Sequence, residues 1–105
     1  MKILFDQGVP VPFRRAFSSH VVSTVYELGW GDLSNGALPK RAEAEFDALT
    51  TTDQNLRFQQ NVAALRLAIV VLLTTDWSVI ARYQKEIVAA VKNARVSEAA
   101  IVTWR

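Results

Sequence analysis

The stretch from Leu67 to Leu73 reads Leu-Ala-Ile-Val-Val-Leu-Leu and contains no polar residue. It is far too short to span a bilayer. It is also continuous, without the alternation of a half-exposed strand, so the strand that it predicts is buried on both faces. Such a strand is typical of a parallel sheet with helices on either side. This run therefore limits the chain to folds built around a buried parallel strand.

Shorter strand-like runs alternate with segments of helical pattern along the rest of the chain. We expect further strands at Lys2–Phe5, Val21–Tyr26 and Phe46–Thr52, and a fifth strand or ordered tail at Ala99–Trp104. Between them we expect a short helix at Pro12–Phe17, a helix capped by Ser34 or Asn35 that ends near Glu45, and a polar, partly helical segment over 55–64. This alternation predicts the α/β class with a mainly parallel sheet.

A last helix is expected after the fourth strand. Thr74-Thr75-Asp76 has the composition of a helix N-cap. The apolar residues that follow recur at helical spacing: Val79, Ile80, Tyr83, Ile87, Val88 and Val91. One face of a single helix would therefore pack against the sheet.

Length and composition narrow the possibilities further. The chain has 105 residues, which fits a single domain over 1–105. It contains no cysteine, which excludes disulfides, thiolate metal sites and a cysteine nucleophile. The net charge of +2 permits an anionic partner, although the basic residues, Arg14 and Arg15 among them, are scattered as on a solvated surface. Asp6 interrupts the first apolar run, so we expect no signal peptide and a cytoplasmic location.

Three aspartates stand where predicted strands end: Asp6, Asp53 and Asp76. Ligands of open α/β sheets bind outside the carboxyl ends of the strands, where the strand order reverses. If the first and third strands are neighbours, Asp6 and Asp53 face one crevice, and carboxylates that close favour a bound cation. Mg²⁺ takes oxygen ligands and typically uses one or two carboxylates, and such a site can activate water. Asp76 is better explained as the cap of the last helix.

Three segments resemble a known family. They are Met1-Lys2-Ile3-Leu4-Phe5-Asp6, Thr52-Asp53-Gln54-Asn55-Leu56 and the buried strand Leu67–Leu72, and together they resemble the small PIN-like proteins related to the Mut7 C-terminal nuclease region. The resemblance covers roughly the first three quarters of the chain. It implies a three-layer domain with central strand order about 2-1-3-4. It also implies a ribonuclease dependent on Mg²⁺ or Mn²⁺, with RNA as substrate. Many such proteins are bacterial toxins that bind an antitoxin protein, and many pair as homodimers.

The resemblance also assigns roles to individual residues. Asp6 matches the acid that ends the first strand of the family, and Asp53 matches the first acid of its Thr-rich motif. Asn55 and Asn35 stand where the family often has further acids, so the implied metal ligands are Asp6, Asp53, Asn35 and Asn55. An asparagine offers a carbonyl oxygen but no charge. Arg57, shortly after Asp53, is the candidate phosphate contact.

Two other functions remain open at this stage. Neutral residues at often-acidic positions favour a catalytically weakened module that binds a protein partner or RNA. A phosphoacceptor signalling domain would also place an Asp after the first and third strands and a Thr after the fourth, as with Asp6, Asp53 and Thr74. The single histidine, His20, is expected in an exposed connector, and Trp30 and Trp77 are expected to pack in the core or at an interface.

Overall fold

The computed structural model describes residues 1–33, 36–56 and 61–102. Five parallel strands form one sheet in the order β2-β1-β3-β4-β5, which confirms the α/β class and the central order 2-1-3-4. The strands are β1 (Lys2–Phe5), β2 (Val21–Thr24), β3 (Ala48–Thr51), β4 (Ala68–Leu72) and β5 (Ala99–Val102). The helices are the 3-10 helices η1 (Val11–Phe17) and η3 (Val62–Ala64), and the α-helices α1 (Ala37–Ala42), α2 (Trp77–Arg82) and α3 (Gln84–Lys92).

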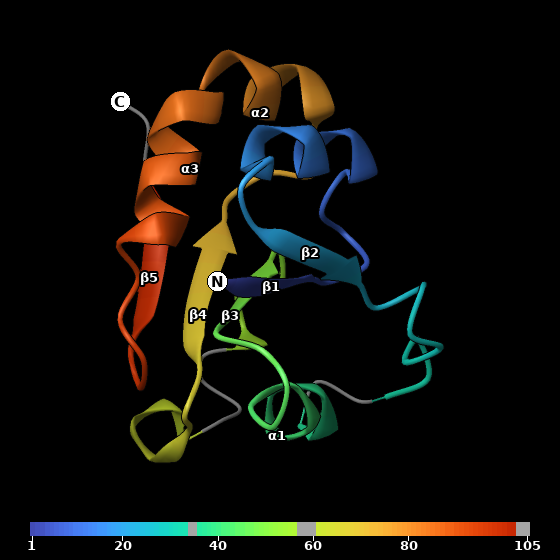
Figure 1. Cartoon of the computed structure of the whole chain (residues 1–105), viewed down its shortest axis with the longest axis vertical. Coiled ribbons are helices and arrows are strands. Elements are labelled where there is room, and N and C mark those ends of the chain that lie inside the picture. Colours follow the sequence, from blue (N-terminus) through green and yellow to red (C-terminus); the bar gives the residue numbers. More distant parts are fainter. Residues whose placement is uncertain (34–35, 57–60, 103–105) are drawn as a thin grey trace.

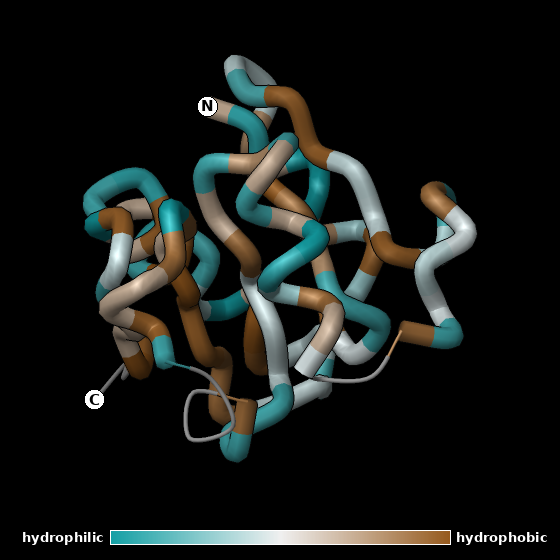
Figure 2. Tube along the Cα trace, turned by 90° about the horizontal axis from the view of Figure 1, so that it is seen from below, coloured by the Kyte–Doolittle hydropathy of each residue, from teal (hydrophilic) through white to brown (hydrophobic). Residues whose placement is uncertain are grey.

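Helices cover the sheet on both faces, which gives three layers (Figure 1). Side chains of a strand alternate between the faces, so each strand contributes to two hydrophobic clusters. The first cluster joins Ile3 and Phe5 of β1 to Phe13 and Phe17 of η1 and to buried residues of α2 and α3. The second joins the sheet to α1 and to the segments around it, through residues that include Leu4, Leu49, Leu38, Phe46 and Leu56. Figure 2 shows hydrophobic stretches of the chain alternating with hydrophilic ones along the trace.

The strand β4 is the fully buried strand that the aliphatic run predicts. All five of its residues are buried, and it pairs with β3 on one side and β5 on the other. It ends at Leu72, one residue earlier than predicted, because Leu73 turns outward and is 41% exposed.

Two other strands are shorter than predicted, and side-chain hydrogen bonds to the backbone lie where they end. β2 ends at Thr24, where the Thr24 hydroxyl accepts from Glu27 N–H at 3.1 Å and the Glu27 carboxylate accepts from Thr24 N–H at 2.9 Å. This reciprocal pair has the pattern of a capping box. β3 ends at Thr51, whose hydroxyl accepts from Asp53 N–H at 3.1 Å.

The last helix is divided in two, where the sequence predicts one. Tyr83 has φ −106° and ψ 23°, which is outside the helical range, and it separates α2 from α3. The predicted apolar face continues across this break, since Ile80 and Ile87 are fully buried in the same cluster. Both halves contact η1, so the bend lets the helical segment follow η1 over the sheet.

The predicted second helix is also shorter than expected. The N-cap position of α1 is Gly36, which has no side chain to accept a capping hydrogen bond. Leu38 and Pro39 of α1 are buried. Ser34 and Asn35, the predicted caps, lie outside the described residues, as does Trp104 at the end of the predicted fifth strand.

Candidate metal site at the carboxyl edge of the sheet

The edge of the sheet between β1 and β3 is a point where strand order reverses. From β1 the chain passes to β2 on one side, and then returns to place β3 on the other side of β1. The crevice outside such a reversal is where ligands of open α/β sheets bind. Asp6 follows β1 directly, and its N–H continues the ladder by donating to Thr50 O at 2.9 Å. The topology therefore places Asp6 at the expected position for a ligand-binding residue.

The hydroxyl of Thr51 connects the two predicted aspartates. It donates to Asp6 Oδ2 at 2.7 Å and accepts from Asp53 N–H at 3.1 Å. Thr51 itself is fully buried at the end of β3, while Asp6 and Asp53 are half-buried. Two residues that lie 47 positions apart in the sequence are thus held beside one buried side chain.

Backbone groups further fix both carboxylates. Asp6 Oδ1 accepts from Gln7 N–H at 2.8 Å, and Asp53 Oδ1 accepts from Asn55 N–H at 2.9 Å. The second bond forms an Asx turn, which starts the segment after β3. A carboxylate has about four lone-pair sites, so the hydrogen bonds named here do not by themselves exclude a cation. Asn55, another of the four predicted ligands, is exposed and lies in the same turn.

Gly8 allows the turn after β1 to lie against the end of β3. A Cβ on Gly8 would fall far inside van der Waals contact with Thr52 Oγ1, and it would also lie 3.5 Å from Thr75 Cγ2. The Gln7 side chain extends in another direction, toward the loop after β2, where its Nε2 would lie 2.7 Å from a Cβ on Gly31. Close approach at these glycines therefore shapes the edge on which Asp6 sits.

Asp76 caps α2, as the sequence predicts. Its Oδ1 accepts from Ser78 N–H at 2.9 Å and from Ser78 Oγ at 2.7 Å. These bonds to Ser78 lower the pKa of the Asp76 carboxyl. The hydroxyl of Thr74 accepts from Asp76 N–H at 3.0 Å, so both residues serve the turn that starts the helix.

The predicted site is thus brought together in part. The structure places Asp6, Asp53 and Asn55 at one edge, whereas Asn35 and Arg57 lie outside the described residues. Within residues 1–33, 36–56 and 61–102, no group of three or more His, Asp or Glu side chains is arranged to hold a metal ion. The donors present are nonetheless hard oxygens, and Mg²⁺ commonly uses one or two carboxylates together with water. Asp6 and Asp53 fit that donor set.

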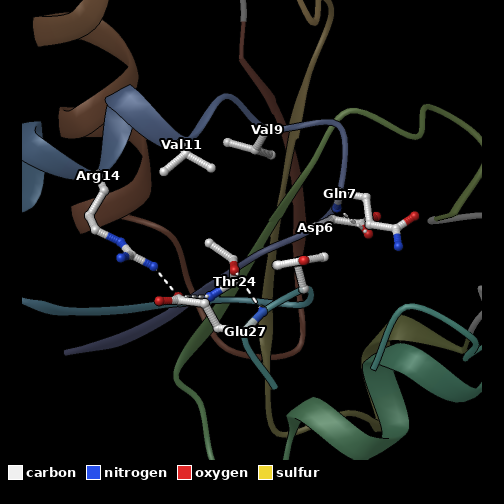
Figure 3. A pocket seen from close by; sticks show the side chains of 8 residues that line it. Asp6, Gln7, Val9, Val11, Arg14, Thr24 and Glu27 are labelled. Carbon is white, nitrogen blue, oxygen red and sulfur yellow. Dashed lines mark hydrogen bonds and ion pairs between the residues drawn. The ribbon is translucent and has the colours of Figure 1, made fainter. Parts of the chain in front are cut away.

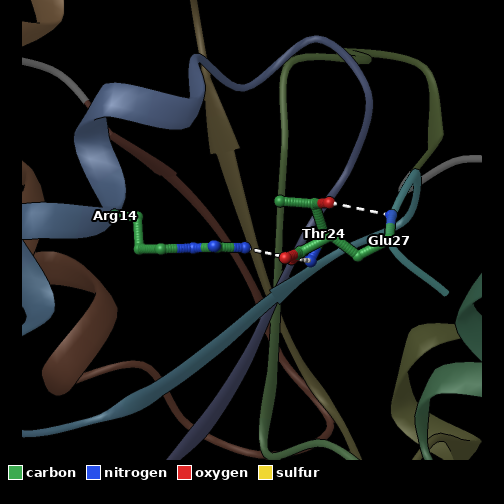
Figure 4. Close-up of polar contacts among 3 residues, drawn as sticks. All are labelled: Arg14, Thr24 and Glu27. Atoms are coloured by element: carbon green, nitrogen blue, oxygen red, sulfur yellow. Dashed lines mark hydrogen bonds and ion pairs between the residues drawn. The ribbon is translucent and has the colours of Figure 1, made fainter.

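A polar contact that the sequence analysis did not predict lies close to this edge. Arg14 of η1 forms an ion pair with Glu27, and Glu27 is held by Thr24 through the reciprocal hydrogen bonds described above (Figure 4). The bond from Arg14, followed by that from Thr24 N–H, lowers the pKa of the Glu27 carboxyl. Arg14 is therefore a paired residue and not simply solvated surface. In the sequence, the Thr-x-x-Glu spacing of Thr24 and Glu27 could have indicated the capping box that holds Glu27.

His20 and Trp30, the other residues singled out from the sequence, have structural contacts. His20 is half-buried, not exposed as expected, because its Nδ1 lies 3.1 Å from the terminal amino nitrogen and its ring packs on Phe17. Trp30 packs edge-on against Phe46, with the Arg41 guanidinium 5.2 Å from its ring centroid. Its expected role in packing is thus confirmed.

Comparison with family models, with characterised proteins and with solved structures found no match to this chain. What the structure shows is the class of fold: a three-layer α/β domain with an all-parallel sheet, in which Thr51 contacts both the Asp6 carboxylate and the Asp53 backbone at the topological reversal. Among the helices that the structure describes, none has the length and apolar character needed to cross a membrane.

Proposed function

We propose that this chain is a PIN-like ribonuclease dependent on Mg²⁺ or Mn²⁺, acting in the cytoplasm as the toxin of a bacterial toxin–antitoxin pair. The observation that carries the proposal is the Thr51 hydroxyl, which joins Asp6 to the Asp53 backbone at the strand reversal. The sequence resemblance supplies the reaction type, and the antitoxin and a second copy of the chain are the partners it suggests.

Asp6 and Asp53 would hold the proposed cation, and Asn55 and Asn35 would contribute carbonyl oxygens. When bound, a divalent cation at such a site lowers the pKa of water and stabilises charge on a phosphodiester. Thr51 orients the Asp6 carboxylate by donating to Oδ2. Arg57 is the proposed contact to the phosphate, which a guanidinium binds in a bidentate manner.

The first test is RNA cleavage by aspartate-to-asparagine variants. An asparagine keeps the carbonyl oxygen that accepts from Gln7 N–H at position 6 or from Asn55 N–H at position 53, so both variants should fold. We expect Asp6→Asn and Asp53→Asn to lose Mn²⁺-dependent cleavage of single-stranded RNA completely. Thr51→Val, which removes an outer partner of the site, should lower cleavage by about 10- to 100-fold.

Asp76→Asn is the matched control for this experiment. It makes the same chemical change after the neighbouring strand β4 and keeps the acceptor for Ser78 N–H. It should cleave like the unaltered chain. Equal cleavage by Asp53→Asn and the unaltered chain would remove the nuclease proposal.

A second candidate function is a catalytically weakened module that binds RNA or a protein partner. It is favoured by the neutral residues at the site, since Gln7 follows Asp6 and Asn55 stands two positions after Asp53. This function predicts that RNA or antitoxin binding survives Asp53→Asn and that titration with Mn²⁺ releases no heat. Metal binding abolished by Asp53→Asn would count against it.

A further inference from the structure

A cavity of about 240 Å³ opens beside the candidate metal site (Figure 3). Asp6 and Gln7 line it at one end, and Arg14 and Glu27 line it at the other. The cavity lies between the turn after β1, the helix η1 and the turn after β2, so it is continuous with the edge on which Asp6 sits. A molecule bound through Asp6 would therefore extend into it.

The far end of the cavity is built as a fixed structure. Glu27 Oε1 accepts from Thr24 N–H at 2.9 Å and also from Arg14, and Glu27 N–H donates to the Thr24 hydroxyl. The helix η1, which carries Arg14, is anchored by Phe13 and Phe17, and both of these side chains are buried in the first hydrophobic cluster. Arg14 and Glu27 therefore present their polar groups in a defined position before any ligand binds.

The walls between the two ends are apolar and aromatic. Val9 is buried, whereas Val11 is 59% exposed and Tyr26 is 85% exposed. An aromatic ring that exposed gains little from packing within its own chain, and it offers a face on which a planar ligand can stack. Base–aromatic stacking of this kind is a general feature of single-stranded nucleic-acid binding.

The charges of the cavity favour a base over a phosphate. Asp6 and Glu27 place carboxylates at its two ends, and Arg14 is the cation that lines it. Because the ion pair with Glu27 already offsets the Arg14 charge, a phosphate group at this end of the cavity would meet no net positive charge. A neutral base has both donors and acceptors on its edge. Those groups match the remaining N–H groups of the Arg14 guanidinium and the oxygens of Glu27.

We propose that this cavity holds one nucleobase of the RNA chain, adjacent to the phosphate engaged at Asp6. The inference rests on the proposed function for its ligand, RNA, and adds the part of the substrate that this chain contacts. Tyr26 stacks on the base, Val9 and Val11 cover its other side, and Arg14 and Glu27 contact its edge.

The experiment measures binding without cleavage. Fluorescein-labelled single-stranded RNA homopolymers are titrated with the full chain in the presence of EDTA, and fluorescence anisotropy gives the Kd. An abasic ribose–phosphate chain of the same length carries the phosphates alone. We expect the base-bearing chains to bind at least about tenfold more tightly than the abasic chain, which is the usual effect of one base–aromatic stack.

Two pairs of variants locate the contact. Tyr26→Ala should weaken binding by about tenfold, whereas Tyr26→Phe, which keeps the ring, should bind like the unaltered chain. Arg14→Gln should weaken binding more than Arg15→Gln, because both remove one positive charge from η1 but only Arg14 lines the cavity. Equal binding of the abasic chain, an unchanged Kd for Tyr26→Ala, or equal effects of the two arginine variants would overturn the inference.

These results separate the inference from the proposed function. A chain that binds bases through Tyr26 but never cleaves RNA supports the cavity and removes the nuclease. A chain that cleaves RNA in a manner dependent on Asp53, yet binds equally with and without Tyr26, retains the nuclease and overturns the cavity assignment.

Discussion

Glycine is required at positions 8 and 29 for different physical reasons. At Gly8 a side chain would collide with Thr52 Oγ1, whereas at Gly29 there is nothing within 4 Å but the backbone has φ 71°. We expect Gly8→Ala to destabilise the protein by about 1–3 kcal/mol through overpacking. Gly29→Ala should cost about 1–2 kcal/mol through its left-handed backbone. Urea denaturation measures both.

The two glycine variants should differ more in activity than in stability. Relief of the collision at Gly8 must move either Thr52 or the turn that carries Asp6, so RNA cleavage should fall well beyond the loss expected from unfolding. A Cβ on Gly29 would meet no atom within 4 Å and so displaces nothing in the turn that carries Asp6, and we expect Gly29→Ala to cleave normally once folded. Normal cleavage by folded Gly8→Ala would show that the close approach does not position Asp6.

Individual site residues differ in how far the sequence predicts them. Asp6 and Asp53 follow apolar runs, and the end of a strand is visible in a sequence. Thr51 and Arg14 act through partners far away in the chain, 45 and 13 positions respectively, and nothing local marks such pairing. The role of Glu27 could have been predicted from its spacing to Thr24, because a capping box is a local sequence pattern.

At the scale of elements, η1 connects the hydrophobic core to the cavity. Phe13 stacks on Phe5 with ring centroids 5.7 Å apart and meets Phe17 edge-on at 5.0 Å. We expect Phe13→Ala to destabilise the protein by about 3–5 kcal/mol, because it removes a fully buried ring. Thermal and urea denaturation measure the loss, and Val21→Ala, at a site 58% exposed, is the control expected to change stability by less than about 0.5 kcal/mol. A loss below about 1 kcal/mol at Phe13 would contradict the described packing.

Element types were more predictable than element ends. The continuous apolar run of β4 has one physical explanation, a strand buried on both faces, and the structure has that strand. The ends of β2 and β3 coincide with turns in which the Thr24 and Thr51 hydroxyls accept from backbone N–H groups, and apolar patterns do not show such turns. The break at Tyr83 lies between two helices that both contact η1, and helical periodicity, which contains no information on such tertiary contacts, predicted a single helix.

At the scale of the whole molecule, the strand order makes the site possible. The residues alone predicted a shared site for Asp6 and Asp53 only if β1 and β3 are neighbours. The strand order that makes them neighbours was suggested by the family resemblance and is the order in the structure. Parallel pairing of Leu4 with Leu49 and of Phe5 with Thr50 brings both carboxyl ends to one level. Strand pairing is a global property, since it depends on which crossovers bury the most apolar surface, and a local pattern cannot determine it.

A cation bound between Asp6 and Asp53 would stabilise the whole fold, because the pair exists only when β1 and β3 are assembled. Binding to the folded state alone adds about 2.7 kcal/mol at a ligand concentration one hundredfold above Kd. We expect saturating Mn²⁺ to raise Tm by several degrees and EDTA to reverse the rise. Asp6→Asn and Asp53→Asn should abolish the shift, measured by differential scanning calorimetry.

Asp47→Asn provides the control at the opposite edge of the sheet. Asp47 Oδ2 accepts from Lys2 N–H at 2.6 Å where the strands begin, and an asparagine there keeps an acceptor. Removing this charge changes the net charge as much as either site variant does, so a general electrostatic effect of Mn²⁺ would weaken equally in all three proteins. Loss of the shift in Asp6→Asn and Asp53→Asn with its retention in Asp47→Asn locates the cation at the β1–β3 reversal. A shift of the same size in all three variants would place the cation elsewhere.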